Sequence, residues 1–192
     1  MKLVYIANIR IPTEKAHGIQ IMKMGENFAK LKIAGKEIEV ELIVPKKSNY
    51  IKEDPFLFYS VNRNFKITRI PCFGLSSAAG FLGQVSFFVQ TVSFLLAARI
   101  HFLFNQFDIL YTREQLTGLF FKKFILEIHS LPKRITSFHK MIWRRADKLV
   151  VLTRPIKSLI VKSGLPADKI LVAADAVDLQ EFDIPISANE AR

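Results

Sequence analysis

The sequence predicts an α/β domain with a parallel β-sheet that is covered by helices on both faces. Short apolar runs alternate with segments of helical periodicity along most of the 192 residues. Parallel strands need crossover connections, which usually carry helices, so this alternation favours a parallel sheet. The runs 124–128 and 149–152 are nearly all apolar, as expected for strands that are buried on both sides. Together these observations predict a Rossmann-like fold.

Composition limits the classes of protein that fit. Hydrophobic residues make up 50% of the chain and charged residues 23%, which excludes a disordered chain and supports one buried core. The single cysteine, Cys72, forms neither an intramolecular disulfide nor a four-cysteine zinc site, so we expect no metal and a reducing, cytoplasmic location. Lysine and arginine outnumber aspartate and glutamate by 28 to 17, and the net charge of +11 favours nucleic acid, anionic lipid or phosphorylated substrates as partners.

The first half of the chain predicts three strands and one helix. Strands are expected at 2–8, 38–44 and 66–70, where short runs are rich in β-branched and apolar residues. The helix at 19–31 follows from apolar residues at helical spacing, and the turn-prone pair His17-Gly18 precedes it.

An uncharged stretch at 70–98 has to be compared with a transmembrane span. Polar or small side chains recur along one face of the helix that it predicts: Ser86, Gln90, Ser93 and Ala97. A helix surrounded by lipid would not need that stripe, so the pattern favours a core helix or a helix on a membrane surface.

The second half continues the alternation of strands and helices. We expect strands at 108–112, 124–128, 148–152 and 170–172, and helices at 114–122, 133–145 and 155–162. Ligands of such sheets bind beyond the carboxyl ends of the strands, so candidate site loops follow Asn8, Thr112, Ile128 and Leu152. No GxGxxG, P-loop, HExxH or GxSxG motif occurs, which removes the common dinucleotide, P-loop, zinc-protease and serine-hydrolase interpretations.

Three of these loops carry polar residues that fit a ligand site. His17, Gly18 and Gln20 stand where the first loop meets a helix whose free N–H groups favour phosphate; alternatively, Gly18 only permits a tight turn. Arg113 can hold a phosphate or carboxylate with two hydrogen bonds, or can pair with a neighbouring acidic residue. His129 is placed for hydrogen bonding or proton transfer, or is a structural histidine.

The predicted helix at 133–145 has a strongly basic face. This face can meet nucleic acid or an anionic membrane, or can simply be solvated. The aromatic residues form no RNP-type motif, which makes nucleic acid the least favoured partner.

Several segments together resemble the amino-terminal domain of retaining glycosyltransferases of the GT-B fold, in the family 4 group. They are 11–12 with 16–24, 40–45, 108–114, 126–132, 145–153, and 164–172 followed by 176–182. The resemblance implies one half of a GT-B fold, in which the amino-terminal domain binds the acceptor and the carboxyl-terminal domain holds the nucleotide sugar.

The resemblance also implies roles for five residues. His129 matches the histidine that contacts the donor sugar near the reacting carbon, and is the expected catalytic residue. Gly18 lies on the loop that faces the donor diphosphate. The expected acceptor contacts are Gln20, Arg113 and His17.

The chain also departs from that family. Residues 174–178 read Ala-Asp-Ala-Val-Asp where the family usually has Pro-Asn-Gly-Val-Asp, the second glycine of the first loop is absent, and no two glutamates stand at E-x7-E spacing. We therefore expect 1–183 to form the amino-terminal domain and 184–192 to begin a truncated linker to an absent carboxyl-terminal donor domain. The expected partner is that donor domain or a separate subunit that supplies it.

The expected function follows from these points. The chain is the acceptor-binding part of an enzyme that moves a sugar, with retention and without a cofactor, from a nucleotide-diphosphate sugar to a glycan or a lipid-linked acceptor, and it is inactive alone. An alternative is a non-catalytic subunit that anchors a split glycosyltransferase to an anionic membrane, peripherally on its cytoplasmic face. A remote alternative is a basic nucleic-acid-binding α/β domain, although we expect no specific nucleic acid partner.

Overall fold

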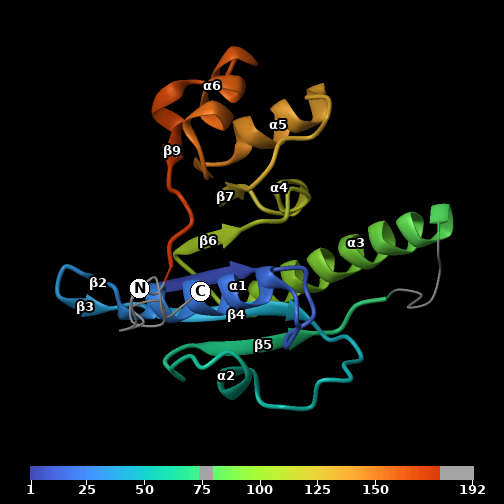
Figure 1. Cartoon of the computed structure of the whole chain (residues 1–192), viewed down its shortest axis with the longest axis vertical. Helices are drawn as coiled ribbons and strands as arrows, with labels where there is room; N and C mark the ends of the chain where they lie inside the picture. Colours follow the sequence, from blue (N-terminus) through green and yellow to red (C-terminus); the bar gives the residue numbers. More distant parts are fainter. Residues whose placement is uncertain (74–79, 178–192) are drawn as a thin grey trace, which may run out of the picture.

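The computed structural model describes residues 1–73 and 80–177. At its centre is a sheet of seven parallel strands in the order β5-β4-β1-β6-β7-β8-β9 (Figure 1). The strands are β1 (Lys2–Ile6), β4 (Glu39–Pro45), β5 (Lys66–Ile70), β6 (Ile109–Thr112), β7 (Ile125–Ile128), β8 (Lys148–Val151) and β9 (Ile170–Val172). The predicted Rossmann-like α/β fold is confirmed. The strand order reverses between β1 and β6, and ligands of such sheets bind at this point.

Helices cover both faces of the sheet, and each face has its own apolar core. The helices are α1 (Ala16–Lys30), α2 (Pro55–Phe58), α3 (Gly80–Phe104), α4 (Thr117–Phe120), α5 (Ser137–Arg145) and α6 (Arg154–Lys162), and the 3-10 helix η1 (Ala167–Lys169) precedes β9. On one face, Ile21 and Met22 of α1 pack in one core with Tyr5 of β1. On the other face, the core contains residues of α3, α5 and α6, and Phe94 and Trp143 in it are fully buried.

The sequence does not predict a short hairpin between α1 and β4. Strands β2 (Lys32–Ile33) and β3 (Lys36–Glu37) pair in antiparallel fashion. The two residues between them, Ala34 and Gly35, have φ of 50° and 76°, as tight hairpin turns require. All four strand residues are exposed, so the hairpin lacks the alternation of apolar and polar residues by which strands are recognised.

Two helices are shorter than predicted because polar side chains bond to the backbone. At 114–122 only Thr117–Phe120 is helical: the Thr112 hydroxyl accepts from the Glu114 N–H, and the Glu114 carboxylate accepts from the Leu116 N–H. These bonds form turns in place of the expected first helical turn. The helix expected from residue 133 begins at Ser137, because Thr136 and His139 form a capping box.

Helix α3 buries two polar residues and leaves an apolar face outside. Gln90 and Thr91 are buried, and both bond to Asn8: Gln90 Nε2 donates to Asn8 Oδ1 at 2.9 Å, and Asn8 Nδ2 donates to Thr91 Oγ1 at 2.7 Å. Gln90 of the predicted polar stripe and its neighbour Thr91 therefore anchor the helix to the loop after β1. The face opposite the buried side chains of α3, which we call the α3 stripe, consists of apolar side chains that are 43% to 69% exposed: Leu82, Val85, Val89, Leu96, Ile100 and Leu103.

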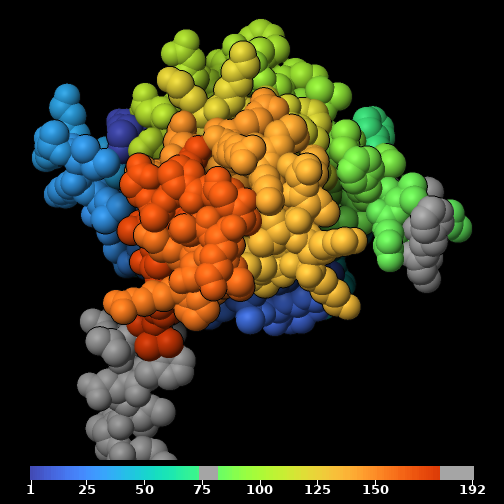
Figure 2. All heavy atoms as spheres, turned by 90° about the horizontal axis from the view of Figure 1, so that it is seen from above, coloured from blue at the N-terminus to red at the C-terminus, as the bar shows by residue number. Residues whose placement is uncertain are grey.

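The α3 stripe runs along a helix that projects from the molecule. The amino-terminal half of α3 extends beyond the edge of the sheet in Figure 1, and atoms in the green of this helix protrude from the side of the molecule in Figure 2. The segment Leu82–Phe104 is long and apolar enough to cross a membrane by length and composition, and 33% of its most apolar window is buried in the protein. A soluble core helix would bury more of this surface, so the α3 stripe calls for an explanation.

Candidate functional site

Residues of α1 and residues at the ends of β6 and β7 lie at the carboxyl edge of the sheet. Arg113 follows β6, and its Nη1 donates a hydrogen bond of 3.0 Å to Oε1 of Gln20 in α1. Gln20 in turn donates from Nε2 to Oδ1 of Asp175. His129 follows β7, and its Nε2 contacts Oε1 of Glu127. The fold therefore gathers three predicted site residues and two acidic residues that were not predicted.

Two buried tyrosines lie between these groups. The rings of Tyr5 and Tyr111 pack edge to face with centroids 5.2 Å apart. Burial raises the pKa of both hydroxyls, the negative charge of Glu127 raises it further, and the positive charge of Arg113 opposes the shift. Both hydroxyls are therefore protonated at neutral pH, and both lie within the electrostatic reach of Glu127 and Arg113.

His17 lies in the first turn of α1, near Arg113. Burial lowers the pKa of the His17 imidazole, and the positive charges of Arg113 and Lys15 lower it further. The imidazole is therefore neutral at pH 7 and has one nitrogen free of a proton to accept a hydrogen bond. The structure thus places His17, Gln20 and Arg113 together, and their role as acceptor contacts stays a prediction.

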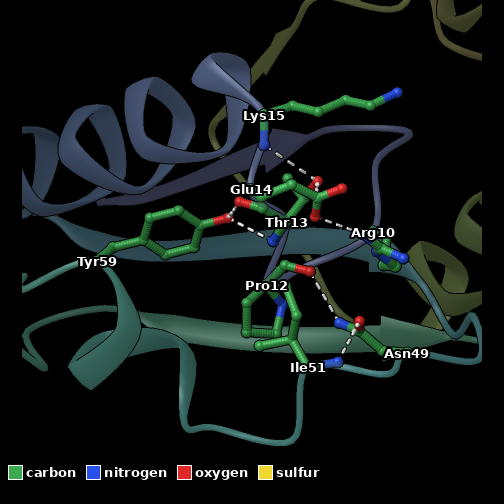
Figure 3. Close-up of polar contacts among 8 residues, drawn as sticks. All are labelled: Arg10, Pro12, Thr13, Glu14, Lys15, Asn49, Ile51 and Tyr59. Carbon is green, nitrogen blue, oxygen red and sulfur yellow. Dashed lines mark hydrogen bonds and ion pairs between the residues drawn. The ribbon is translucent and has the colours of Figure 1, made fainter.

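The loop between β1 and α1 is held by side chains from distant parts of the chain (Figure 3). The Tyr59 hydroxyl accepts from the Thr13 N–H and donates to the Thr13 carbonyl, both at 2.6 Å. Asn49 Nδ2 donates to the Pro12 carbonyl at 2.8 Å, and the peptide bond between Ile11 and Pro12 is cis. The loop that leads into α1 is therefore fixed on both sides before any ligand binds.

Gly18 is buried against this loop. A Cβ atom on Gly18 would lie 2.3 Å from Tyr59 Oη and 2.6 Å from Thr13 Cγ2. Its backbone is helical, so the residue is glycine because of close packing and not because of a special turn conformation. No side chain caps the first turn of α1, and Lys15 occupies the N-cap position, so the amino end of this helix can still face an anion. The donor-binding role of Gly18 stays a prediction.

The sequence interpretation missed Glu127, Asp175 and the two tyrosines. Glu127 lies in β7 and His129 directly follows it, two positions later, which is the spacing that puts two side chains on one face of a strand; this spacing is the one signal in the local sequence. In residues 1–73 and 80–177 no group of three metal-ligating side chains forms. Two surface hollows of about 560 Å³, one beside β5 and α2 and one beside α6, include none of the predicted site residues.

Comparison with known proteins gives matches in structure only. No protein-family profile matches the chain, and no curated protein matches it in sequence. Alr3699/HepE of Anabaena, in complex with UDP and glucose, is 10% identical, with a TM-score of 0.56, over 94% of this chain and 46% of that one. The lipopolysaccharide outer core galactosyltransferase WaaB is 15% identical, with a TM-score of 0.54, over 93% of this chain and 47% of that one. The UDP-GlcNAc 2-epimerase of Neisseria meningitidis, bound to UDP-GlcNAc, is 9% identical, with a TM-score of 0.60, over 90% of this chain and 46% of that one.

These matches concern the fold. They cover at least nine-tenths of this chain, and the chain spans about half the length of each structure that it matches. Glycosyltransferases and an epimerase are both among them, so the shared feature is the architecture and not one reaction. The chain therefore has a GT-B-like fold, the architecture of these nucleotide-sugar enzymes.

Proposed function

We propose that the chain is the acceptor-binding half of a retaining glycosyltransferase that takes a sugar from a nucleotide-diphosphate sugar. In this proposal His17, Gln20 and Arg113 contact the acceptor, His129 contacts the donor sugar, and the amino end of α1 at Gly18 faces the donor diphosphate. The acceptor is a glycan or a lipid-linked sugar. A second domain, attached or supplied by a separate subunit, holds the nucleotide.

One observation carries this proposal: the polar residues after β6 and β7 converge with those of α1 at the carboxyl edge of a GT-B-like sheet. Arg113 presents a guanidinium that Gln20 holds in place at 3.0 Å. A positioned guanidinium and a neutral imidazole suit a sugar that carries hydroxyl and anionic groups. The expected roles of these side chains therefore agree with their placement.

Binding of a small sugar phosphate tests the acceptor site. We expect glucose 1-phosphate to shift the backbone amide signals of α1 and of Arg113 in the 15N NMR spectrum of the chain. Arg113→Ala removes a charge-assisted hydrogen bond and should weaken binding about tenfold or more. Arg154→Ala, which deletes an exposed arginine of α6, is the matched control and should leave binding unchanged. Shifts that map to α6, or that survive Arg113→Ala, would contradict the proposal.

Turnover tests the claim that the chain is only half of the enzyme. Stabilising a departing nucleotide diphosphate requires preorganised donors on both sides of a cleft, and this proposal puts the other side on a second domain. We expect the chain alone to release no UDP from UDP-glucose above the background rate. Release at about 1 s⁻¹ or more, an ordinary enzymatic rate, would show that the chain is catalytically complete.

The α3 stripe favours a second function, anchoring to an anionic membrane at its cytoplasmic face. The six apolar side chains of the α3 stripe lie along one face of the helix and are exposed, and the chain has a net charge of +11. An interfacial helix that buries such a face gains free energy from each apolar side chain, and the positive charge adds attraction to anionic lipid. This function is compatible with the first, because a membrane-bound domain is well placed to receive a lipid-linked acceptor.

Lys47 supports a phosphate-bearing acceptor near this helix. Burial lowers the pKa of Lys47; the neighbouring Cys72 opposes this shift, and the charge of Arg10 adds to it. Cys72 in turn bonds to Gln90 of α3. Among the described residues no carboxylate pairs with Lys47, so an anionic group would supply the partner that this half-buried ammonium lacks.

Vesicle binding tests the membrane function. We expect the chain to co-sediment with vesicles of phosphatidylcholine and phosphatidylglycerol, less so at high salt. Replacing Leu96, Ile100 and Leu103 together by serine should reduce binding more than tenfold, because each apolar side chain contributes about 1.5–3 kcal/mol when buried.

The matched control changes three exposed leucines elsewhere. Leu57, Leu159 and Leu171 are also exposed, and their replacement by serine should leave vesicle binding unchanged. Equal losses in the two triple variants, or no binding by the unmodified chain, would contradict a membrane role for α3.

A further inference from the structure

Glu127 is a buried carboxylate to which the proposed function assigns no role. Its side chain is 5% exposed and lies near the end of β7, two positions before His129. Burying a carboxylate costs free energy unless hydrogen bonds replace its water. An apolar residue at this position of the strand would pack without that cost. The residue therefore calls for a reason other than stability.

The contacts of Glu127 single out one nitrogen of His129. Oε1 of Glu127 contacts Nε2 of His129. An ionised carboxylate only accepts hydrogen bonds, so Nε2 carries the proton and donates it. Nδ1 is then the nitrogen left for a ligand. The His129 side chain is 22% exposed, so part of the imidazole reaches the surface, whereas the Glu127 carboxylate that it contacts is buried.

Two buried tyrosine hydroxyls lie near the Glu127 carboxylate. The Tyr5 and Tyr111 hydroxyls from β1 and β6 both lie within its electrostatic reach, and the guanidinium of Arg113 acts on the same two hydroxyls. Oε2 of Glu127 is buried and has no hydrogen-bond partner among the described residues. The carboxylate therefore lies between the imidazole of His129, which Oε1 contacts, and the buried hydroxyl of Tyr111, which also interacts with Glu127.

We infer that Glu127 is the positioning residue for His129. It fixes the plane of the imidazole and keeps the proton on Nε2, so that Nδ1 is presented at the carboxyl edge of the sheet as a hydrogen-bond acceptor. A carboxylate or carbonyl behind a histidine sets the tautomer in the same way at many functional sites. What Nδ1 binds rests on the proposed function, in which it is a hydroxyl of the donor sugar; the bond between Glu127 and His129 does not rest on it.

NMR of the imidazole nitrogens tests this inference in the full chain. With 15N-labelled histidine, and with His129→Asn to assign the signals, we expect His129 to show a protonated Nε2 and an unprotonated Nδ1. Its Nε2 proton should be shifted downfield and protected from exchange with water. In Glu127→Gln that protection should fall about tenfold or more, because a bond to a charged acceptor becomes a bond to a neutral one.

Glu41→Gln is the matched control. Glu41 is also a buried strand glutamate, with a side chain 1% exposed, but it lies on the opposite face of the sheet and pairs with Lys2. This variant should leave the His129 signals unchanged. Equal protection of the His129 proton in Glu127→Gln and the unmodified chain would overturn the inference.

The unmodified chain alone also decides the question, whether or not the variant folds. If its His129 carries the proton on Nδ1, then Glu127 does not accept from Nε2 and the inference is wrong. This result is separate from the sugar-phosphate titration above, since the tautomer is read without any ligand. Failure of the titration with a protected Nε2 proton would contradict the proposed acceptor site and leave the positioning role of Glu127 supported.

Discussion

Replacing Gly18 by alanine tests how tightly α1 packs against the loop before it. The new Cβ would lie 2.3 Å from Tyr59 Oη and 2.6 Å from Thr13 Cγ2, and real Cβ atoms do not approach other atoms within 3.0 Å, so Tyr59 and Thr13, or α1, have to move. Tyr59 is not free to move, because its hydroxyl makes two hydrogen bonds of 2.6 Å to the backbone of Thr13. A methyl group at Gly18 therefore fits only if the two buried hydrogen bonds between Tyr59 and Thr13 are broken or distorted.

The expected cost follows from three contributions. Two lost hydrogen bonds cost about 1 kcal/mol each, and forcing a methyl group into a packed site costs about 1–3 kcal/mol. Alanine is preferred over glycine in a helix by up to about 1 kcal/mol, which acts in the opposite direction. Gly18→Ala should therefore lower the free energy of unfolding by about 2–5 kcal/mol.

Urea unfolding followed by tryptophan fluorescence measures this change. The chain has one tryptophan, Trp143, which is fully buried and so reports on loss of the core. Gly25→Ala is the matched control in the same helix: the three atoms nearest to its Cβ would all belong to the Phe65 ring, at 3.0–3.3 Å, a less severe approach than the 2.3 Å at Gly18. We expect its cost to be smaller than that of Gly18→Ala.

A double variant identifies the source of the cost. Tyr59→Phe removes the oxygen that Gly18→Ala would strike, so the two substitutions together should cost at least about 1 kcal/mol less than the sum of their separate effects. A Gly18→Ala protein within about 0.5 kcal/mol of the unmodified chain would refute the packing argument. Strict additivity with Tyr59→Phe would show that the clash lies elsewhere.

Three further substitutions test other parts of the structure. Burial alone would raise the pKa of Glu41, but hydrogen bonding and the charge of Lys2 outweigh it, so the pKa in the folded state lies below the ordinary value. The ionised Glu41 side chain therefore stabilises the fold at pH values above the ordinary pKa, and this stabilisation is lost as the pH falls through the lowered pKa. Glu41→Gln should therefore flatten the loss of stability between about pH 5 and pH 3 in urea titrations. Phe94→Ala should cost about 3–5 kcal/mol in the same assay, whereas Leu103→Ala, on the exposed face of the same helix, should cost less than about 1 kcal/mol. Gly118→Ala should lower the melting temperature, because its Cβ would lie 2.8 Å from a core phenylalanine ring; an unchanged melting temperature would contradict this packing.

The central strands are visible in the sequence because they are buried on both faces: β1 and β4 are buried along nearly their whole length. The edge strands predicted at 66–70 and 170–172 are also confirmed to the residue; Pro71 follows the first, and Lys169 precedes the second. The hairpin at 32–37 carries no such pattern, because neither of its faces is buried. The region 114–122 has helical periodicity, but the hydroxyl and carboxylate groups just before it bond to the backbone and shorten the helix.

The site was predictable only where it depends on the ends of strands. Gln20 and Arg113 could be placed at the carboxyl edge of the sheet from topology, and they form a hydrogen bond there. Asp175 could not be placed, because it is 155 positions from Gln20 and lies in a loop without periodicity. The contact of Tyr59 with the first loop joins positions 46 apart and depends on how α2 packs.

Gln20 stands between a cation and an anion, and this fixes which way its amide points. The oxygen has to face Arg113, which only donates, and the nitrogen has to face Asp175, which accepts. Reversing the amide would break both bonds at once. In this orientation the Gln20 oxygen bonds only to a donor and the Gln20 nitrogen only to an acceptor. A ligand that takes the place of Asp175 at Gln20 therefore has to offer an acceptor, such as a hydroxyl or carboxylate oxygen, and one that takes the place of Arg113 has to offer a donor.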